Sequence, residues 1–382
     1  MLLYSGKPEY CMQFLESGSK VLIFMKRDWA VACVCLSLAV MSSCTNSKER
    51  EGITEIDVRL KQDVGANVPF HYSEMIDSIQ FISLDSDIVG YVNDIKYCNG
   101  KYYLLSRSKA EIFVFDSSGD VISRVGRQGR ANNEYVSVTA FDINPANNEV
   151  SIYDVATRRI VIFSSSGEYV RSIYPEISVF RDFSISAHGD YFVYTPDYMN
   201  NSPRGLWQLD CDGKIKEMKW TVPENFRLCI LRTSPPIYFS RLSDFSLSLL
   251  GELNDNIVFE IGDNGDVAPK IQYLFDVKIS NQLRQVEVVK EADALDKSFF
   301  YIHFYAETDR WSIMAVWYQS KIKTVFYDKL NHMRHVVAND FEYDYDVNGC
   351  EQVTILRGAG DRFLGLKEDE NGLQSLVIIY LK

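Results

Sequence analysis

Four aspartates stand in short apolar segments that resemble one another, and together they could form a cation site. They are Asp94 in VNDI, Asp142 in AFDI, Asp182 in RDFSI and Asp244 in SDFSL. If these segments are the innermost strands of a repeated unit, their carboxylates converge on one axis. Carboxylate oxygens suit Ca²⁺ or Mg²⁺, and mutual repulsion would raise the pKa of one carboxyl. A structural role, in which each carboxylate accepts backbone N–H bonds, is favoured because two further repeats do not clearly contain the aspartate.

A loop between two predicted strands is a second candidate, as a surface that recognises a partner. Its residues are Arg127, Arg130, Glu134 and Tyr135. Exposed arginine and tyrosine are common in recognition surfaces. The alternative is an Arg–Glu ion pair that holds neighbouring repeats together, and the sequence leaves both interpretations open.

Aromatic and acidic residues also gather between positions 301 and 311, where they could stack on sugars. In a β protein such residues more often fill the space between sheets. The pair His332 and His335 would face opposite sides of a strand, which weakens a metal interpretation. The sequence contains no GxxxxGK[ST] loop, no strand-linked GxGxxG and no GxSxG elbow. We therefore assign no catalytic residue.

The elements that would position these residues recur about every 50 residues, the period of a propeller blade. In residues 101–126 and again in 148–174, two strands are followed by a Ser-Gly turn and a further strand. The turn glycines, Gly119 and Gly167, supply the positive φ that such a turn needs. One more apolar strand precedes each copy, so each repeat holds four strands.

The two ends of the repeat array predict how the ring closes. Six copies can be counted, and the last lacks its fourth strand. An unpaired strand, IQFISL at 79–84, precedes the first complete copy. Placing it in the last blade removes an exposed edge. The sequence therefore predicts an all-β, six-bladed β-propeller of four-stranded antiparallel blades over residues 76–382, with a helical insertion at 281–297. A pair of open β-sandwiches is the less favoured alternative.

The first residues predict export and a lipid anchor. An apolar run at 29–41 follows Lys26 and Arg27 and is too short to span a bilayer. It ends in MSSC, which resembles a bacterial lipobox, so Cys44 is the expected lipidation site. Residues 1–43 would be an upstream segment and signal peptide, with Met25 as the expected true start. Residues 44–75 would be a lipidated N-terminus and linker.

Composition narrows the class of partner. The chain has 382 residues, 46% hydrophobic and 24% charged, which excludes bulk disorder. Its net charge of −12 argues against a nucleic-acid partner. The cysteines after Cys44 form no CxxC pair, so a zinc site is not expected, although Cys211 and Cys229 could form a disulfide. We expect a monomer.

The chain resembles the six-bladed β-propeller lipoproteins of Bacteroidetes, which are related in shape to NHL-repeat propellers. The resemblance rests on DSIQFISLD, on KYYLLS followed by IFVFDSSG, on KSFFYIHFYAETDRW, and on VGRQGRANNEYVSVTAFDI. The last stretch is similar to a GRxGxGPGEY loop, which Gly126, Arg127, Gly129, Glu134 and Tyr135 match. Residues 131–133 depart from the Pro-Gly turn of that loop. The resemblance implies a fold and an envelope location, with no particular ligand.

Three functions remain open at this level. The favoured one is an envelope-anchored lipoprotein of the outer membrane, periplasmic or surface-exposed, that binds or scaffolds a protein or glycan. The lipid bilayer would be a further partner, through Cys44. The first alternative is a hydrolase, lactonase or lyase that depends on a metal in the channel. The second is an envelope sensor of a small molecule.

Overall fold

Strands dominate the part of the chain that this computed structural model describes. The described residues are 47–50, 52–61, 70–84, 89–106, 108–195, 204–221, 239–250, 256–278, 300–319, 321–337, 343–344 and 353–382. A four-residue helix, α2 (Tyr72–Met75), lies among them. Within these ranges no helix is long and apolar enough to cross a membrane. The signal segment, Cys44 and the helical insertion predicted at 281–297 fall outside the described residues.

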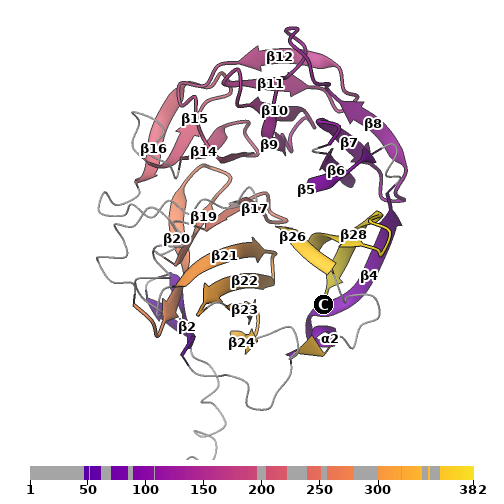
Figure 1. The fold of residues 1–382 in the computed structure, drawn as a ribbon. Helices are drawn as coiled ribbons and strands as arrows, with labels where there is room; N and C mark the ends of the chain where they lie inside the picture. The colour runs from indigo at the N-terminus through magenta and orange to yellow at the C-terminus, as the bar shows by residue number, and fades with distance from the viewer. Residues whose placement is uncertain are drawn as a thin grey trace, which may run out of the picture. The chain divides into compact units, whose positions relative to one another are not determined.

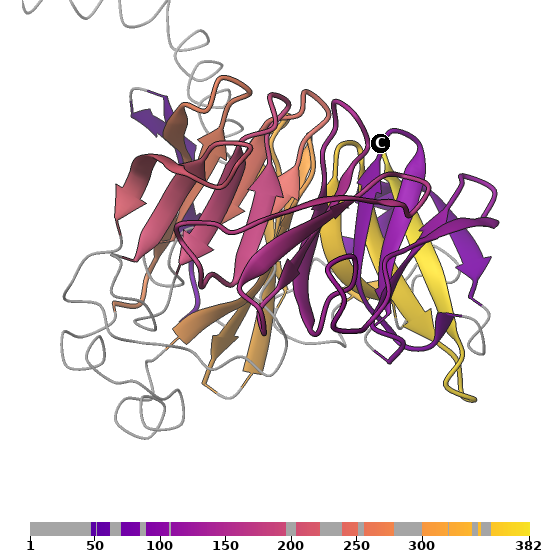
Figure 2. The same cartoon turned by 90° about the horizontal axis from the view of Figure 1, so that it is seen from above.

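Four separate antiparallel sheets of four strands each lie around a ring (Figure 1). The first three are consecutive, and strands of a fifth, larger sheet stand on both sides of the fourth. The first two contain β5 (Val92–Cys98), β6 (Lys101–Ser106), β7 (Glu111–Phe115), β8 (Val121–Val125), β9 (Val138–Ile143), β10 (Val150–Asp154), β11 (Arg159–Phe163) and β12 (Tyr169–Ile173). The other two contain β13 (Asp182–Ile185), β14 (Tyr191–Thr195), β15 (Gly205–Leu209), β16 (Ile215–Thr221), β21 (Phe300–Glu307), β22 (Trp311–Tyr318), β23 (Lys321–Asp328) and β24 (Met333–Val337). The fold is all-β and propeller-like, and Figure 2 shows the same sheets from above.

A ten-stranded mixed sheet completes the ring. Its strands are β1 (Ser47–Arg50), β2 (Ile53–Val58), β20 (Val267–Phe275), β19 (Ile257–Ile261), β18 (Leu247–Leu250), β17 (Phe239–Arg241), β26 (Val353–Ala359), β27 (Arg362–Glu368), β28 (Gln374–Leu381) and β4 (Ile76–Ser83), in spatial order. Its two halves meet at a single parallel pair, Arg241 of β17 with Ala359 of β26. A separate two-stranded parallel sheet pairs β3 (Phe70–His71) with β25 (Tyr343–Asp344).

The N-terminal strand closes the ring as the sequence predicts. β4 pairs antiparallel with β28, from Ser83 opposite Ser375 to Ile76 opposite Leu381. This pairing supplies a fourth strand to the last three strands of the chain. It joins segments nearly 300 residues apart, which explains why the last repeat can lack a strand of its own.

The predicted linker at 44–75 is wrong for part of its length, because it contains strands. β1 and β2 form a hairpin, and β2 runs parallel to β20 from Thr54 opposite Ile271 to Val58 opposite Phe275. The side chains of Ile56 and Val58 are buried. Burying an apolar side chain of this kind stabilises the fold by about 1.5–3 kcal/mol. This explains why a segment with many polar residues still joins the sheet as an outer strand.

The core lies between neighbouring sheets. In the second sheet β10 and β11 are buried throughout, whereas β12 begins with exposed residues. One apolar cluster joins the first two sheets, with Val114 and Val150 among its members. The two middle strands are therefore packed on both faces, and β9, which carries Asp142, is held in place by its pairing with β10.

Candidate functional site

Asp142 on β9 is a buried carboxylate that accepts hydrogen bonds from four different groups. It is 3% exposed. Its Oδ1 lies 3.1 Å from Nζ of Lys96, and its Oδ2 lies 2.8 Å from Nη2 of Arg241. Ser184 Oγ and the Ile185 backbone N–H also donate to Oδ2, at 2.7 and 2.8 Å. Burial alone would raise the pKa of Asp142, but the two cations outweigh it and hold that pKa well below its ordinary range.

Asp94 on β5 is paired with Arg357 of β26. Arg357 donates to Asp94 from Nη2 at 3.0 Å and from Nε at 3.2 Å, and its Nη1 donates to the Phe239 carbonyl at 2.8 Å. Burial would lower the pKa of Arg357, but Asp94, then Asp182, raise it. Asp182 is buried on β13 and accepts the Phe183 backbone N–H at 2.9 Å. The pairings bridge strands on several sides of the ring.

The predicted ring of four aspartates is wrong for Asp244. β17 ends at Arg241, so Asp244 falls in the following turn, exposed, where its Oδ1 accepts bonds from the backbone N–H and hydroxyl of Ser246. Within the described residues, no group of three or more His, Cys, Asp or Glu could hold a metal ion. Arg and Lys side chains occupy the positions beside Asp94 and Asp142 that a metal ion would take.

Sequence reasoning missed the basic partners of these aspartates. Lys96, Arg241 and Arg357 are the three cations on the inner strands β5, β17 and β26. Lys96 could have been found, because it lies two residues after Asp94 and strand residues two apart share a face. Arg241 and Arg357 could not, because only the closed ring brings them to Asp142 and Asp94.

The loop predicted for recognition is organised around structural contacts. Arg127 Nε donates to Glu134 Oε1 at 2.7 Å, and the Ala131 backbone N–H donates to the other oxygen at 2.9 Å. Backbone donation from Ala131, with the Arg127 contacts, lowers the pKa of Glu134. Arg130 is exposed. Tyr135 is fully buried, so its predicted place on a recognition surface is wrong.

Tyr135 joins the first two sheets. Its hydroxyl donates to the Ala110 carbonyl at 2.5 Å, and its ring meets Phe163 edge-on with centroids 6.3 Å apart. A Cβ on Gly126 would lie 2.5 Å from the Tyr135 ring, so this glycine leaves room for it. The Arg127–Glu134 ion pair lies within the loop itself, so the contact that joins neighbouring repeats is Tyr135 and not the ion pair that the sequence suggested.

Replacing Tyr135 by phenylalanine should lower the free energy of unfolding by about 1–2 kcal/mol, because the partly buried Ala110 carbonyl loses its donor. Urea unfolding measures this. The matched control is Tyr169→Phe, where the hydroxyl is 3.4 Å from Ser172 Oγ on an exposed strand. The control should change stability by less than about 0.5 kcal/mol. Equal effects of the two substitutions would contradict the bridging role.

The aromatic stretch predicted at 301–311 fills space inside the protein. Tyr305 and Trp311 are buried. Glu307 is buried too, and it is bound by Lys329 Nζ at 2.7 Å and by the Tyr305 hydroxyl at 2.7 Å. Burial would raise the pKa of Glu307, but Lys329 lowers it below its ordinary range. These contacts agree with the interpretation favoured from the sequence, in which the aromatic residues fill the space between sheets. Cys211 is an exposed free thiol, and its suggested partner Cys229 lies outside the described residues.

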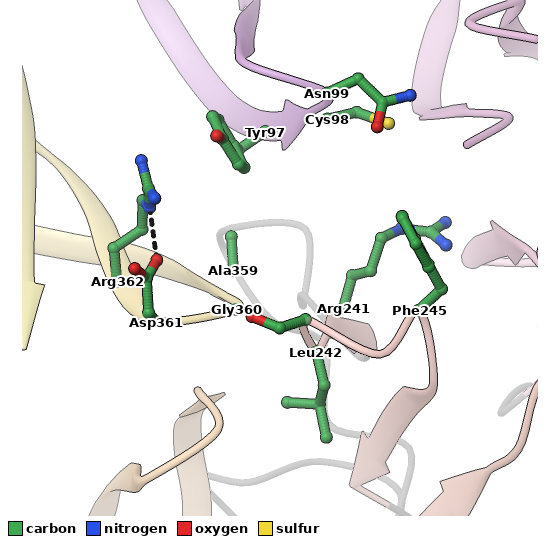
Figure 3. A pocket seen from close by; sticks show the side chains of 11 residues that line it. Tyr97, Cys98, Asn99, Arg241, Leu242, Phe245, Ala359, Gly360, Asp361 and Arg362 are labelled. Carbon is green, nitrogen blue, oxygen red and sulfur yellow. Dashed lines mark hydrogen bonds and ion pairs between the residues drawn. The ribbon is translucent and has the colours of Figure 1, made fainter. Parts of the chain in front are cut away.

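A pocket of about 260 Å³ lies where the inner strands β5, β17 and β26 end (Figure 3). Its walls come from three stretches of chain: 97–99, the corner after β17 and the corner after β26. Arg362 and Asp361 stand on one side and are joined by a 2.8 Å ion pair. The Arg362 guanidinium also stacks on the Tyr97 ring, 4.4 Å from its centroid. Burial raises the pKa of the Cys98 thiol to about 11, so this group in the pocket wall is neutral.

Comparison with known proteins gives a family match and several structural relatives. Residues 53–373 match the family described as "Domain of unknown function (DUF4934)". Among solved structures, BF0058 of Bacteroides fragilis NCTC 9343, named as an exported protein, is similar with a TM-score of 0.69 at 14% identity, covering 86% of this chain and 100% of that chain. A DUF4221 family member from Bacteroides vulgatus is similar with a TM-score of 0.51 at 11% identity, covering 81% and 98%. Among curated proteins, none matches the sequence. These structural likenesses support the fold.

Proposed function

Since the chain belongs to the DUF4934 family of domains of unknown function, we propose from its geometry that it is a binding or scaffold protein of the cell envelope. Its partner would be an envelope protein or a glycan. The observation that carries this proposal is the pairing of charge on the axis, where Arg357 holds Asp94, and Lys96 and Arg241 hold Asp142. A carboxylate engaged in this way is a poor base and a poor metal ligand. In this proposal the ion-paired residues around the axis have a structural role, and the face of the ring that carries the pocket binds the partner.

The proposal includes a six-bladed ring. The four separate sheets would be four blades, and each half of the ten-stranded sheet would be one more. One half would be β17–β20, with β2 and β1 added at its outer edge. The other would be β26–β28 completed by β4. A single pair, Arg241 with Ala359, joins the two halves, which supports counting them apart.

Turnover assays on the purified full chain test the proposal against a metal-dependent hydrolase, lactonase or lyase. The probes are a panel of lactones and aryl glycosides, each with Ca²⁺, Mg²⁺ or EDTA. We expect rates equal to those of heat-unfolded protein. Turnover that requires one of the cations would overturn the proposal and favour the enzyme.

The anchor is proposed to be a lipid on Cys44, in the outer membrane. Support comes from the lipobox-like MSSC and from the exported name of the Bacteroides fragilis relative. Replacing Cys44 by serine should move the protein from the membrane fraction to the soluble fraction and abolish labelling with an alkyne fatty acid. Ser43→Ala is the matched control and should leave both unchanged. A Cys44→Ser protein that stays labelled and membrane-bound would contradict the anchor.

A further inference from the structure

The pocket at the ends of β5, β17 and β26 has an aromatic residue in a conformation that normally requires glycine. Phe245 has φ +65 in the corner between β17 and β18. The corner between β13 and β14 has the same pair of backbone hydrogen bonds: Leu242 N–H to Ser246 O corresponds to Ser186 N–H to Asp190 O, and Phe245 N–H to Leu242 O corresponds to Gly189 N–H to Ser186 O. There the left-handed position is Gly189, at φ +85. Positive φ in a bulky residue is a strained arrangement, and such strain is concentrated at ligand-binding positions.

The strained corner presents an apolar ring to solvent at the pocket. Phe245 is 40% exposed and lines the pocket beside Arg241. A glycine would adopt this corner at no conformational cost, whereas phenylalanine strains the backbone and still leaves 40% of its surface exposed. The exposed part of its ring at the pocket offers a flat contact surface for a bound molecule.

The charges around the pocket are balanced. Arg241 is paired with Asp142 at 2.8 Å, and Arg362 is paired with Asp361 at 2.8 Å. The Cys98 thiol, with its raised pKa, is neutral as well. Asp142 is shared by Lys96 and Arg241, while Arg357 faces both Asp94 and Asp182, so three carboxylates stand against three cations on the inner strands. Because the charge of this wall is balanced only as a group, a neutral ligand fits it better than a charged one.

Hydrogen-bonding groups remain available for such a ligand. Asn99 uses its amide NH₂ on the Pro145 carbonyl and Asn148, and within the described structure its Oδ1 accepts no bond. The Ser243 hydroxyl is likewise unused by the described residues, and the Asp361 side chain is 63% exposed, with only Oδ1 engaged by Arg362. Nη1 of Arg241 is buried and has no hydrogen-bond partner among the described residues, so it can donate to a ligand's hydroxyl oxygen. Together these groups are two acceptors, a hydroxyl and a donor beside an aromatic face.

We propose that this pocket binds one neutral pyranose ring, with an apolar face of the sugar on Phe245 and its hydroxyls on Asn99, Ser243 and Asp361. A volume of about 260 Å³ is below the range of about 300–1,000 Å³ found for drug-sized ligands, which suits a single ring or the end of a chain of sugars. The inference deepens the proposed function, because it names the glycan as partner and rests on the binding role proposed above.

Titration calorimetry and ligand-observed NMR on the full chain test the proposal. The probes are the methyl pyranosides of glucose, galactose and mannose, with glucuronate as a charged ring and N-acetylphenylalanine amide as the mimic of a protein partner. We expect at least one methyl pyranoside to bind more tightly than the last two. The proposal is overturned if no methyl pyranoside binds, or if glucuronate or the phenylalanine amide binds best.

The deciding variant is Phe245→Gly. It should weaken pyranoside binding by about tenfold or more, as expected for loss of an aromatic contact at a binding site. Glycine relieves the positive φ but gives up the buried part of the phenylalanine ring, so circular dichroism must show that the variant is folded at the temperature of the binding measurement. Phe81→Ala, which removes an aromatic of similar exposure (42%) on β4, should bind as the wild type does. Unchanged binding by Phe245→Gly would overturn the site.

The test of the sugar pocket and the test of the lipid anchor can fail independently of each other. Pyranoside binding is measured in solution and does not depend on Cys44. A protein that is lipidated but binds no sugar would refute the pocket alone. A protein that binds sugar but stays soluble would refute the anchor alone.

Discussion

Replacing Asp142 by asparagine should lower the free energy of unfolding by about 3–5 kcal/mol, the cost of breaking a buried ion pair. The asparagine can still accept bonds from Ser184 and Ile185, but it leaves Lys96 and Arg241 without their counter-charge. Both cations are largely buried, so water cannot replace the lost carboxylate. Guanidinium unfolding monitored by circular dichroism measures the loss.

The matched control is Asp244→Asn. Asp244 was predicted to belong to the same ring, yet it is exposed in a turn, and among the described residues its hydrogen bonds go to Ser246. This substitution should cost less than about 1 kcal/mol. A difference of less than 1 kcal/mol between the two variants would contradict a structural role for Asp142.

The effect of Asp142 should also depend on pH with a definite sign. Its pKa is depressed in the folded state, so the carboxylate stabilises the fold fully at pH values above the unfolded pKa of about 4. That contribution is lost as the pH falls below about 4 towards the folded pKa. The stability difference between wild type and Asp142→Asn should therefore be constant from about pH 5 to pH 8 and shrink in acid. A difference that grew in acid would contradict the assigned ion pairs.

Replacing Gly358 by alanine should also be strongly destabilising. β26 passes so close to the end of β21 that a Cβ on Gly358 would lie 1.8 Å from the Glu307 carbonyl oxygen and 2.4 Å from its carbon. Both atoms belong to backbone, and Glu307 is itself held by Lys329, so neither side can move cheaply. We expect a loss of about 3 kcal/mol or more, at or above the upper end for overpacking.

Gly262→Ala is the control for Gly358→Ala. Its added Cβ would lie 2.9 Å from Oδ1 of Asn264, which belongs to an exposed side chain that can rotate away. Melting temperatures of the two variants should differ by several degrees. Similar melting temperatures would mean that β26 does not pack against β21 as closely as described.

The fold was largely predictable from the sequence because its determinants are local and repeated. The Ser-Gly turns and the alternating strands recur within each repeat, and Gly119 and Gly167 have the positive φ that their turns predict. Ring closure by β4 followed from the unpaired strand at 79–84. The hairpin β1–β2 was missed because its burial depends on β20, more than 200 residues away.

The candidate site was predictable only in part. The inner-strand positions of Asp94, Asp142 and Asp182 followed from the repeat. Asp244 was misplaced because β17 has only three residues, so the repeat shifts there. The pocket could not be foreseen, since its walls come from strands that are distant in sequence, and neither could the strain at Phe245, which is a property of the folded corner.

Whether the axis is held by ion pairs or by a bound cation is decided most directly by calorimetry of the full chain in EDTA, Ca²⁺ and Mg²⁺. A cation present at a hundred times its Kd would add about 2.7 kcal/mol to the free energy of unfolding, a shift that calorimetry resolves easily. We expect the same melting temperature in all three conditions, because Arg357 neutralises Asp94, and Lys96 and Arg241 neutralise Asp142. A melting temperature that falls in EDTA and is restored by one cation would contradict the ion-paired axis and favour a metal-dependent enzyme.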